Sequence, residues 1–486
     1  MMKRQILLSG IILLILFACD GEVDRISRLP LGPSDVTKQR YDNVMANLRI
    51  TDSSNVITSD DAANIARITD ILSGSKTKAE AKEVDNIVAL FNDDGEVVMY
   101  AVNYKYNEGY TLVSASKNYY PILAQVEKGN FNDSIYNTGS SVILGEYDYV
   151  LSNIELLPED TINKMRKLWY PYEKRSDMPY QATRINEFDT FIVNTLHGWS
   201  NDENVHDFYN LYEAQNRIPS SLYSTFCAMA EGTSHPDYDY MTYSFVVESV
   251  ERVSYNPNDY MLTTEWSQGF PYNNSVGELD SGNVPYPVGC GSVAMGQIMK
   301  YYQWPDYFAW SYMPAKLDYS ITYETELSNF LEELAQKIRI KGQNIDVSDI
   351  QNIRNSLIED YNYNSGCSIV SHNPSIVKNS LMNYGPVFMK GHTTDGVGHA
   401  WVCDGYGYNQ NRIVYTLYVI ATSSTLEYIT AGDSVNGEII NSGEFFHMNW
   451  GGGGLHNGWF VSSARAINVI QGYTENRQDL IDIRPN

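Results

Sequence analysis

One segment in the second half of the chain combines a glycine-flanked cysteine with a helical pattern. Residues 289–302 read Gly-Cys-Gly-Ser-Val-Ala-Met-Gly-Gln-Ile-Met-Lys-Tyr-Tyr. The apolar residues recur at helical spacing, which predicts a helix with one buried face, and Trp304 and Pro305 end it. Cys290 then lies at the N-terminus of this helix, where unpaired N–H groups and the helix dipole favour a thiolate. The position suits a nucleophile, and it also suits a small buried residue in a packed turn.

The composition is that of a folded, acidic protein with more than one domain. The chain has 486 residues, of which 43% are hydrophobic and 13% aromatic, and this length favours at least two domains. The net charge is -25, and acidic residues outnumber basic ones in both halves. No basic face is predicted, so nucleic acid is not an expected partner.

The first residues predict an export signal. Lys3 and Arg4 precede an apolar run over 6–17 that is too short to span a membrane. The run continues into Leu-Phe-Ala-Cys19, which resembles a bacterial lipobox and implies cleavage before Cys19 and lipid attachment to its sulfur. The alternative is a signal removed by the general signal peptidase. We expect an exported bacterial lipoprotein at the outer membrane or cell surface, with release after maturation left open.

The remaining cysteines predict neither a disulfide scaffold nor a metal site. Cys227, Cys290, Cys367 and Cys403 are few for so long an exported chain. They have no Cys-x-x-Cys spacing, so a zinc site is not expected, and neither is a cofactor. One bridge among Cys227, Cys367 and Cys403 stays open.

Residues 50–135 have the pattern of a small α+β domain. A helix is expected to start within 58–68, with Ser59 as its N-cap. A hairpin turn at 92–95 separates the first two of several strand-like runs. The expected strands are Asn86–Phe91, Val97–Tyr104, Gly109–Ala115 and Pro121–Val126.

The segment that follows shows weaker patterns. Residues from about 140 to 175 have helix-like spacing, whereas 176–250 show little periodicity. We interpret 176–250 as an irregular connector in which a maturation cleavage could fall.

The last part of the chain predicts helices first and an antiparallel sheet afterwards, the order of a two-lobed α+β domain. The expected helices are 290–303, 325–338, 348–360 and 374–383. The expected strands are 387–391, 399–405, 413–421, 426–430, 444–450 and 458–462.

A thiolate nucleophile needs a partner that takes and returns a proton, and His suits this near neutral pH. His399 follows Gly398 and precedes an apolar strand, a context that can hold an imidazole rigidly. Asn449 and Trp450 lie where another strand runs into four glycines, and either could orient or shield that imidazole. The order Cys290, His399, Asn449 is papain-like. Gln268, upstream, supplies an amide donor for an oxyanion hole beside the Cys290 backbone N–H.

Five segments in order resemble the streptopain family of secreted cysteine peptidases. They are Trp266-Ser267-Gln268 with Pro271-Tyr272-Asn273, the Gly289-Cys290 turn with its helix, Tyr384-Gly385-Pro386-Val387, Gly398-His399-Ala400 with Asp404-Gly405-Tyr406, and Asn449-Trp450-Gly451. The runs Gly109–Ala115 and Pro121–Leu123 are similar to that family's inhibitory propeptide.

This resemblance implies an α+β fold, with a papain-like two-lobed catalytic domain (helical lobe plus antiparallel sheet) preceded by a small α+β propeptide domain. The implied division is 1–18 signal peptide, 19–49 tether, 50–135 inhibitory propeptide-like domain, 136–254 connector with a helical region, and 255–486 cysteine peptidase domain.

The resemblance also implies a function, that of a cysteine endopeptidase made as a zymogen. Cys290 would be the nucleophile, His399 the general acid/base and Gln268 an oxyanion donor, with Asn449 or Trp450 supporting His399. The implied partners are protein or peptide substrates, the chain's own propeptide as an intramolecular inhibitor, and the membrane through the lipid anchor.

Two departures from the family pattern concern substrate preference. Gly452 stands where an aromatic residue is usual, and residues 406–443 form a longer separation than expected.

Two other functions remain open from the residues. An amidase or transglutaminase would use the same Cys-His chemistry, and a non-catalytic surface-binding lipoprotein could retain the scaffold. The four glycines at 451–454 lack the following Lys of a phosphate-binding loop. His447 and His456 flank the expected site, and we interpret them as hydrogen-bonded structure.

Overall fold

The computed structural model describes residues 47–50, 54–73, 82–132, 139–173, 205–232, 241–255, 260–277, 282, 284–338, 349–393, 396–422, 427–431, 435–463, 470 and 477–486. The expected signal peptide, Cys19 and most of the tether lie outside these residues. The chain divides into one unit over residues 1–44 and a second over 45–486. The helices and strands described below all belong to the second unit.

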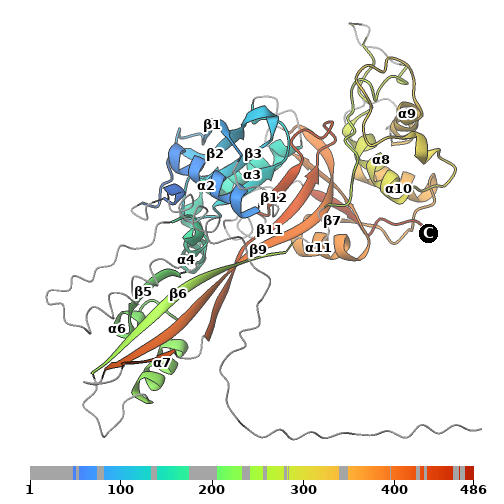
Figure 1. Ribbon diagram of the computed structural model, residues 1–486. Helices are drawn as coiled ribbons and strands as arrows, with labels where there is room; N and C mark the ends of the chain where they lie inside the picture. Colours follow the sequence, from blue (N-terminus) through green and yellow to red (C-terminus); the bar gives the residue numbers. More distant parts are fainter. Residues whose placement is uncertain are drawn as a thin grey trace, which may run out of the picture. The chain divides into compact units, whose positions relative to one another are not determined.

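The N-terminal domain is one helix packed on an antiparallel meander, as predicted (Figure 1). Its core is built from α2, β2 and β3, with Ile65, Val102 and Val113 fully buried. The elements are α2 (Ser59–Ser73), β1 (Val84–Phe91), β2 (Val97–Tyr104), β3 (Tyr110–Ser114) and β4 (Ile122–Val126).

The N-cap of α2 differs from the prediction by one residue. Thr58, and not Ser59, caps the helix, because Ser59 already belongs to its first turn. The Asp61 N–H donates to the Thr58 hydroxyl oxygen (3.2 Å), and the Thr58 N–H donates to the Asp61 carboxylate (3.1 Å). This reciprocal pair satisfies two N–H groups at the helix start.

The region predicted as helical beyond residue 140 contains two helices, α3 (Ser140–Ser152) and α4 (Glu159–Lys167). Short 3-10 turns follow each of them, η3 (Ile154–Leu156) and η4 (Tyr170–Tyr172). Most of α3 is buried, so this helix lies inside the fold and not on its surface.

The prediction of an irregular connector is wrong for residues 205–232 and 241–250, the part of 176–250 that the structure describes. They form β5 (Val205–Asn210), α6 (Leu211–Ala214), α7 (Ser220–Gly232) and β6 (Met241–Tyr255). Strand β6 pairs along its whole length with β9, as Figure 1 shows. Its pattern was hard to recognise because Val246 and Val247 are both buried, and burial on both faces removes the alternation that marks a strand.

The four helices predicted in the last part of the chain are present. They are α8 (Cys290–Tyr302), α9 (Glu326–Ile338), α10 (Ile350–Glu359) and α11 (Pro374–Asn383), with a short turn η5 (Trp310–Tyr312). Helices α8, α9 and α10 share a hydrophobic core that includes Met295, Leu331 and Ile353.

The predicted strands are also present, with changes at their ends. The strands are β7 (Ser368–Ser371), β8 (Val387–His392), β9 (Gly398–Thr422), β10 (Glu427–Ala431), β11 (Val435–Asn449), β12 (Gly458–Val461) and β13 (Gln478–Ile481). The runs 399–405 and 413–421 belong to one long strand, and β7 and β13 were not predicted. The long separation at 406–443 is an extension of β9 and β11 with β10 beside them.

The described strands form one sheet that crosses from the N-terminal domain into the C-terminal part. Its order is β1-β2-β3-β4-β12-β11-β9-β8-β13-β7, with β6 and β10 also paired to β9. The crossing is the antiparallel pair β4–β12, in which Val126 lies opposite Gly458 and Ala124 opposite Phe460.

The two faces of the C-terminal sheet carry different elements. On β9, Ala400 and Val402 belong to the helical core of α8, α9 and α10, whereas Trp401 and Cys403 belong to the core shared with α3. Strand alternation makes this division. The helical lobe therefore covers one face and α3 covers the other.

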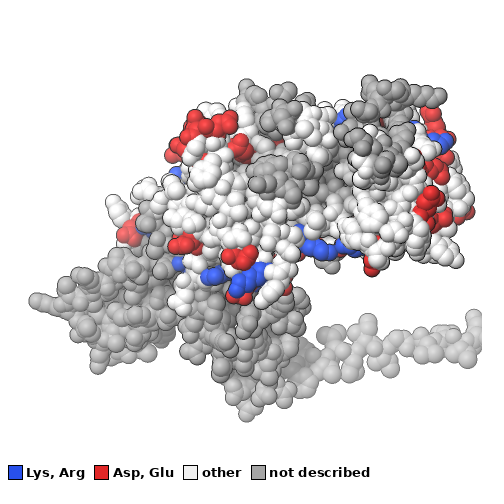
Figure 2. Space-filling view, turned by 90° about the horizontal axis from the view of Figure 1, so that it is seen from above, with Lys and Arg blue, Asp and Glu red and all other residues white. Residues whose placement is uncertain are grey.

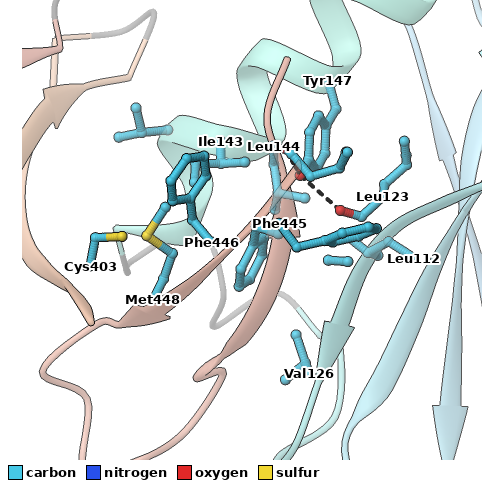
Figure 3. Packing of buried hydrophobic residues seen from close by; sticks show 14 of the residues in the cluster. Leu112, Leu123, Val126, Ile143, Leu144, Tyr147, Cys403, Phe445, Phe446 and Met448 are labelled. Carbon is cyan, nitrogen blue, oxygen red and sulfur yellow. Dashed lines mark hydrogen bonds between the residues drawn. The ribbon is translucent and has the colours of Figure 1, made fainter. Parts of the chain in front are cut away.

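Figure 3 shows the shared core on the α3 face. Ile143 and Leu144 of α3 lie near Phe446 of β11, and the Tyr147 hydroxyl donates to the Leu123 carbonyl (2.8 Å). The same hydroxyl also contacts the Val461 carbonyl at 2.8 Å. The α+β fold expected from the sequence is confirmed, with an N-terminal domain that is packed directly on the C-terminal sheet.

Among the described helices, none has the length and apolar character that a membrane crossing requires. On the face seen in Figure 2, acidic side chains gather in separate groups, with basic side chains between them.

Candidate active site

Cys290 is the first residue of α8, as the sequence predicts. The preceding Gly289 has φ of 92°, a left-handed conformation that glycine adopts without strain. Gly289 has no side chain that could cap the helix, and a helix start of this kind favours an anion such as a thiolate. The Cys290 thiol is not in a disulfide and is partly buried against the helical core.

Gln268 lies beside the turn that leads into Cys290. Its carbonyl accepts a hydrogen bond from the Val288 N–H (2.9 Å), two residues before the cysteine. The neighbouring Ser267 forms a β-bridge with Gly452, and the Gly453 N–H donates to the Trp266 carbonyl (3.0 Å). The segment 266–268 is thus tied both to the nucleophile turn and to the glycine loop.

His399 is the second residue of β9 and lies opposite Gly391 of β8. Strand alternation places its side chain on the face of Trp401, which is the face that α3 covers. A Cβ placed on Gly391 would lie 2.9 Å from Cγ1 of Val142 in α3 and 3.2 Å from the Trp401 ring. Helix α3, which follows the N-terminal domain, therefore covers the sheet face on which the His399 side chain lies.

Asn449 and Trp450 lie on opposite faces of the sheet. Asn449 is opposite Val402, and its amide donates to the Thr264 carbonyl (2.8 Å) and accepts from the Gln297 amide (3.3 Å). Its side chain is buried and held by residues of the helical lobe. These two partners were not identified from the sequence. Gln297 was recognised only as part of the predicted helix, and no sequence pattern marked Thr264 as a partner of Asn449.

Trp450 lies on the face of His399. Its ring is 5.3 Å from that of Trp401, and its indole N–H donates to the His456 carbonyl (2.8 Å). A Cβ on Gly139, just before α3, would lie 2.7 Å from the Trp450 ring. Trp450 thus lies on the sheet face of His399, whereas Asn449 lies on the opposite face.

Gly452 leaves open space where an aromatic residue was expected. A Cβ at Gly452 would meet only the Leu455 carbonyl, at 3.7 Å. The nearby Gly453 approaches the Tyr319 hydroxyl, which would lie 3.3 Å from a Cβ there.

The other cysteines do not take part in the site. Cys227, Cys367 and Cys403 are free thiols, so the disulfide left open by the sequence is absent among them. Burial raises the pKa of the Cys367 thiol and raises that of Cys403 well above its ordinary value. Both are therefore poor nucleophiles. Within the described ranges, no group of three His, Cys, Asp or Glu side chains is placed to hold a metal ion.

Two family models match the chain in the order that the fold shows. Residues 54–150 match the Spi protease inhibitor, and residues 266–330 and 306–460 match the Peptidase C10 family. The C-terminal part of the chain, residues 266–460, is therefore similar to the peptidase C10 family. The streptopain-like resemblance and the inhibitory N-terminal domain are confirmed by these matches.

A curated relative and two solved structures are similar to parts of the chain. The thiol protease/hemagglutinin PrtT of Porphyromonas gingivalis is 24% identical over 267 residues, which cover 45% of this chain and 26% of that protein. The match thus spans about a quarter of the relative's length. A prointerpain A fragment of Prevotella intermedia aligns over 82% of this chain and 98% of its own, with 13% identity and a TM-score of 0.41. Active interpain A of the same organism covers 46% of this chain and 93% of its own, with 16% identity and a TM-score of 0.29.

Proposed function

We propose that this chain is a cysteine endopeptidase made as a zymogen. The observation that carries the proposal is the position of Cys290, which opens α8 beside the Gln268 segment in a chain whose C-terminal part is similar to a peptidase family. The helix start favours the thiolate, which is the nucleophilic form of cysteine.

The proposed reaction has two halves. The Cys290 sulfur attacks the peptide carbonyl carbon, and the oxyanion receives hydrogen bonds from the Gln268 amide and the Cys290 backbone N–H. The His399 imidazolium gives its proton to the leaving amine, which forms the acyl-enzyme. His399 then takes a proton from water, the water attacks the thioester, and the thiol is restored.

Trp450 and Asn449 take different roles in this proposal. Trp450 shields the imidazole of His399 from water, because both side chains belong to one face of the sheet. Asn449 fixes the glycine loop to the helical lobe through Thr264 and Gln297. It acts on His399 only through the strand that carries it.

The N-terminal domain together with α3, which is part of the inhibitor-like residues 54–150, keeps the enzyme latent by covering the His399 face. Val142 of α3 approaches Gly391, and Gly139 approaches Trp450 and Trp401. A substrate that needs the same face cannot enter while α3 is present. Separation of the N-terminal domain then starts activity.

Replacing Cys290 by Ala tests the proposed function. We expect the variant to lose both self-processing and cleavage of casein, because no other described cysteine lies at this helix start. Cys227→Ala, a replacement of another free and only partly buried cysteine, is the control and should behave as the parent. If Cys290→Ala digests casein as well as the parent does, the proposal is wrong. Isopeptide and amine-acceptor substrates separate a peptidase from an amidase or transglutaminase.

Export and anchoring are a separate part of the proposal, and they rest on the first residues of the sequence. The lipobox-like ending before Cys19 supports lipid attachment to that cysteine. We expect the chain expressed in bacteria to fractionate with membranes and Cys19→Ser to move to the soluble fraction. Equal membrane association of both chains would contradict the anchor.

A further inference from the structure

The two histidines that flank the candidate site, His447 and His456, both face the N-terminal domain. The His456 N–H donates to the Lys128 carbonyl (3.0 Å), and its ring lies 3.5 Å from the position of a Cβ on Gly129. Burial lowers the pKa of His456, so the neutral ring is the form that packs there. His456 therefore belongs to the contact between the two parts of the chain.

His447 is buried between one carboxylate of the sheet and one of the N-terminal domain. Its Nδ1 lies 2.7 Å from Asp404 Oδ1, and its Nε2 lies 3.8 Å from Glu127 Oε1. The Tyr260 ring stacks on it at 3.9 Å with an interplanar angle of 7°. The Tyr260 hydroxyl donates to the same Glu127 carboxylate (3.2 Å).

Tyr260 remains a neutral donor at this position. Burial, and then the nearby Glu127 carboxylate, raise the pKa of Tyr260 to about 12. The Glu127 carboxylate therefore accepts a hydrogen bond from the Tyr260 hydroxyl and lies 3.8 Å from the His447 ring, beyond hydrogen-bond distance.

The next residue, Lys128, contacts a carboxylate on the segment that carries Gln268. Its ammonium lies 3.1 Å from Glu265 Oε2, which Lys316 also approaches at 2.8 Å. Burial alone would raise the pKa of Glu265, but hydrogen bonds from Lys316 and Lys128 outweigh it and hold that pKa below its ordinary value. Glu265 is thus ionised, three residues before Gln268.

The backbone fixes which side chain meets which group. The Glu127 N–H donates to the Asn457 carbonyl (3.1 Å), which continues the β4–β12 pairing by one residue. A Cβ on Gly458 would lie 2.3 Å from the Gln125 carbonyl, so glycine is needed for β4 to approach. In this register the Glu127 side chain lies next to His447 and the Lys128 side chain lies next to Glu265.

We propose that Tyr260, His447 and Glu265, at the edge of β12, form a docking site for an acidic residue followed by a basic residue in an extended chain. The N-terminal domain fills this site with Glu127 and Lys128, and this contact helps to keep the chain latent. The inference rests on the proposed function for its activity readout, but the contact itself is independent of catalysis.

The docking site favours an acidic residue followed by a basic residue over the reverse order. Glu127→Lys would remove the acceptor of the Tyr260 hydrogen bond and place an ammonium group there, with Asp404 and Glu265 as the nearby carboxylates. A glutamate at position 128 would face Glu265. Lys316 also holds Glu265, so the site keeps its carboxylate when Lys128 leaves.

Variants of the N-terminal domain test the docking site without touching catalytic residues. The variants are Glu127→Gln, Lys128→Met and the double exchange Glu127→Lys with Lys128→Glu, all in the full-length chain. Glu83→Gln and Lys105→Met are matched controls, because these residues form an ion pair within the N-terminal domain.

We expect faster self-processing in the docking variants and none of this effect in the controls. The Lys128–Glu265 pair is partly exposed, so Lys128→Met should accelerate processing about two- to fivefold. Glu127→Gln removes the charge that faces His447 and weakens the Tyr260 hydrogen bond. Because the Glu127 side chain is also partly exposed, this substitution should accelerate processing about two- to fivefold as well. The double exchange should give the largest effect, while the processed enzymes hydrolyse a short reporter peptide at equal rates.

A second measurement keeps this test independent of activity. In a Cys290→Ala background, hydrogen exchange of the β4 amides should be faster in the docking variants, most of all in the double exchange. Exchange and processing rates that match the parent in all three docking variants would overturn the docking site. A chain without any peptidase activity, but with the expected exchange differences, would instead contradict only the proposed function.

Discussion

The chemistry of the site depends on a few side chains whose backbone positions are set by neighbouring glycines. Gly289 lets Cys290 open a helix, and Gly391 leaves room for Val142 opposite His399. Cys290, His399 and Gln268 could be proposed from local sequence, because each lies in a short pattern that limits its conformation. The sheet faces on which Asn449 and Trp450 lie could not be predicted from local sequence. They depend on strand register and on the irregularity between His447 and Met448.

At the residue scale, we expect Gln268→Ala to lower kcat about a hundredfold or more while KM changes little, as for other single oxyanion donors. The reason is that the amide would meet the substrate oxygen mainly after it becomes negative. Steady-state kinetics on a short peptide measures the effect. Gln336→Ala, on the exposed side of α9, is the control. A variant that changed only KM would show that Gln268 binds substrate without stabilising the oxyanion.

Regular elements were predictable where one face is buried, and less so where two faces are buried. The helices of the last part of the chain were predicted within two residues of their ends. Helix α9 has the one buried face that its pattern predicts. The prediction of one buried face is wrong for α8, in which all residues from Gly291 to Met299 are buried. Strand β6 was missed because consecutive residues, such as Val246 and Val247, are buried, so the strand lacks a polar face in its sequence. The pairing of β6 with β9 joins residues far apart in sequence, which no local pattern reports.

At the element scale, Glu248 of β6 makes a pH-dependent contribution to stability. Burial raises the pKa of Glu248 to about 7, against 4.5 for an ordinary glutamate, and the Tyr209 hydroxyl lies 3.3 Å away. The folded chain thus binds the proton more tightly than the unfolded chain. The contribution is complete below about pH 4.5 and is lost as the pH rises through 7.

We therefore expect Glu248→Gln to melt at a higher temperature than the parent at pH 8 and at a similar temperature near pH 5. Scanning calorimetry of both chains in a Cys290→Ala background measures this. Glu213→Gln, an exposed glutamate of α6, should show no such difference. A parent that is equally or more stable than Glu248→Gln at pH 8 would contradict the protonated, buried carboxyl.

The whole molecule is organised by a sheet that the N-terminal domain completes. β4 pairs with β12, and α3 buries its apolar side chains against β9 and β11 in one common core. The order of domains could be predicted from the sequence, since each has its own pattern. Their direct pairing could not, because it depends on which strand edges meet after each part has folded.

At this scale, we expect Gly458→Ala to weaken the attachment of the N-terminal domain. The added methyl would meet the Gln125 carbonyl and the Val126 Cα, a close contact that typically costs about 1–3 kcal/mol. Limited proteolysis of the Cys290→Ala chain should then release the N-terminal domain faster. Gly452→Ala, where the nearest atom is 3.7 Å away, is the matched control for a glycine of the same segment. Equal release from both variants would show that β4 does not need this close approach.

Mass spectrometry of the purified full-length chain after incubation tests most directly that Cys290 hydrolyses peptide bonds. We expect new termini that separate the inhibitor-like residues 54–150 from the peptidase residues 266–460 in the parent, and none in Cys290→Ala. The same termini appearing at the same rate in both chains would contradict a Cys290 peptidase.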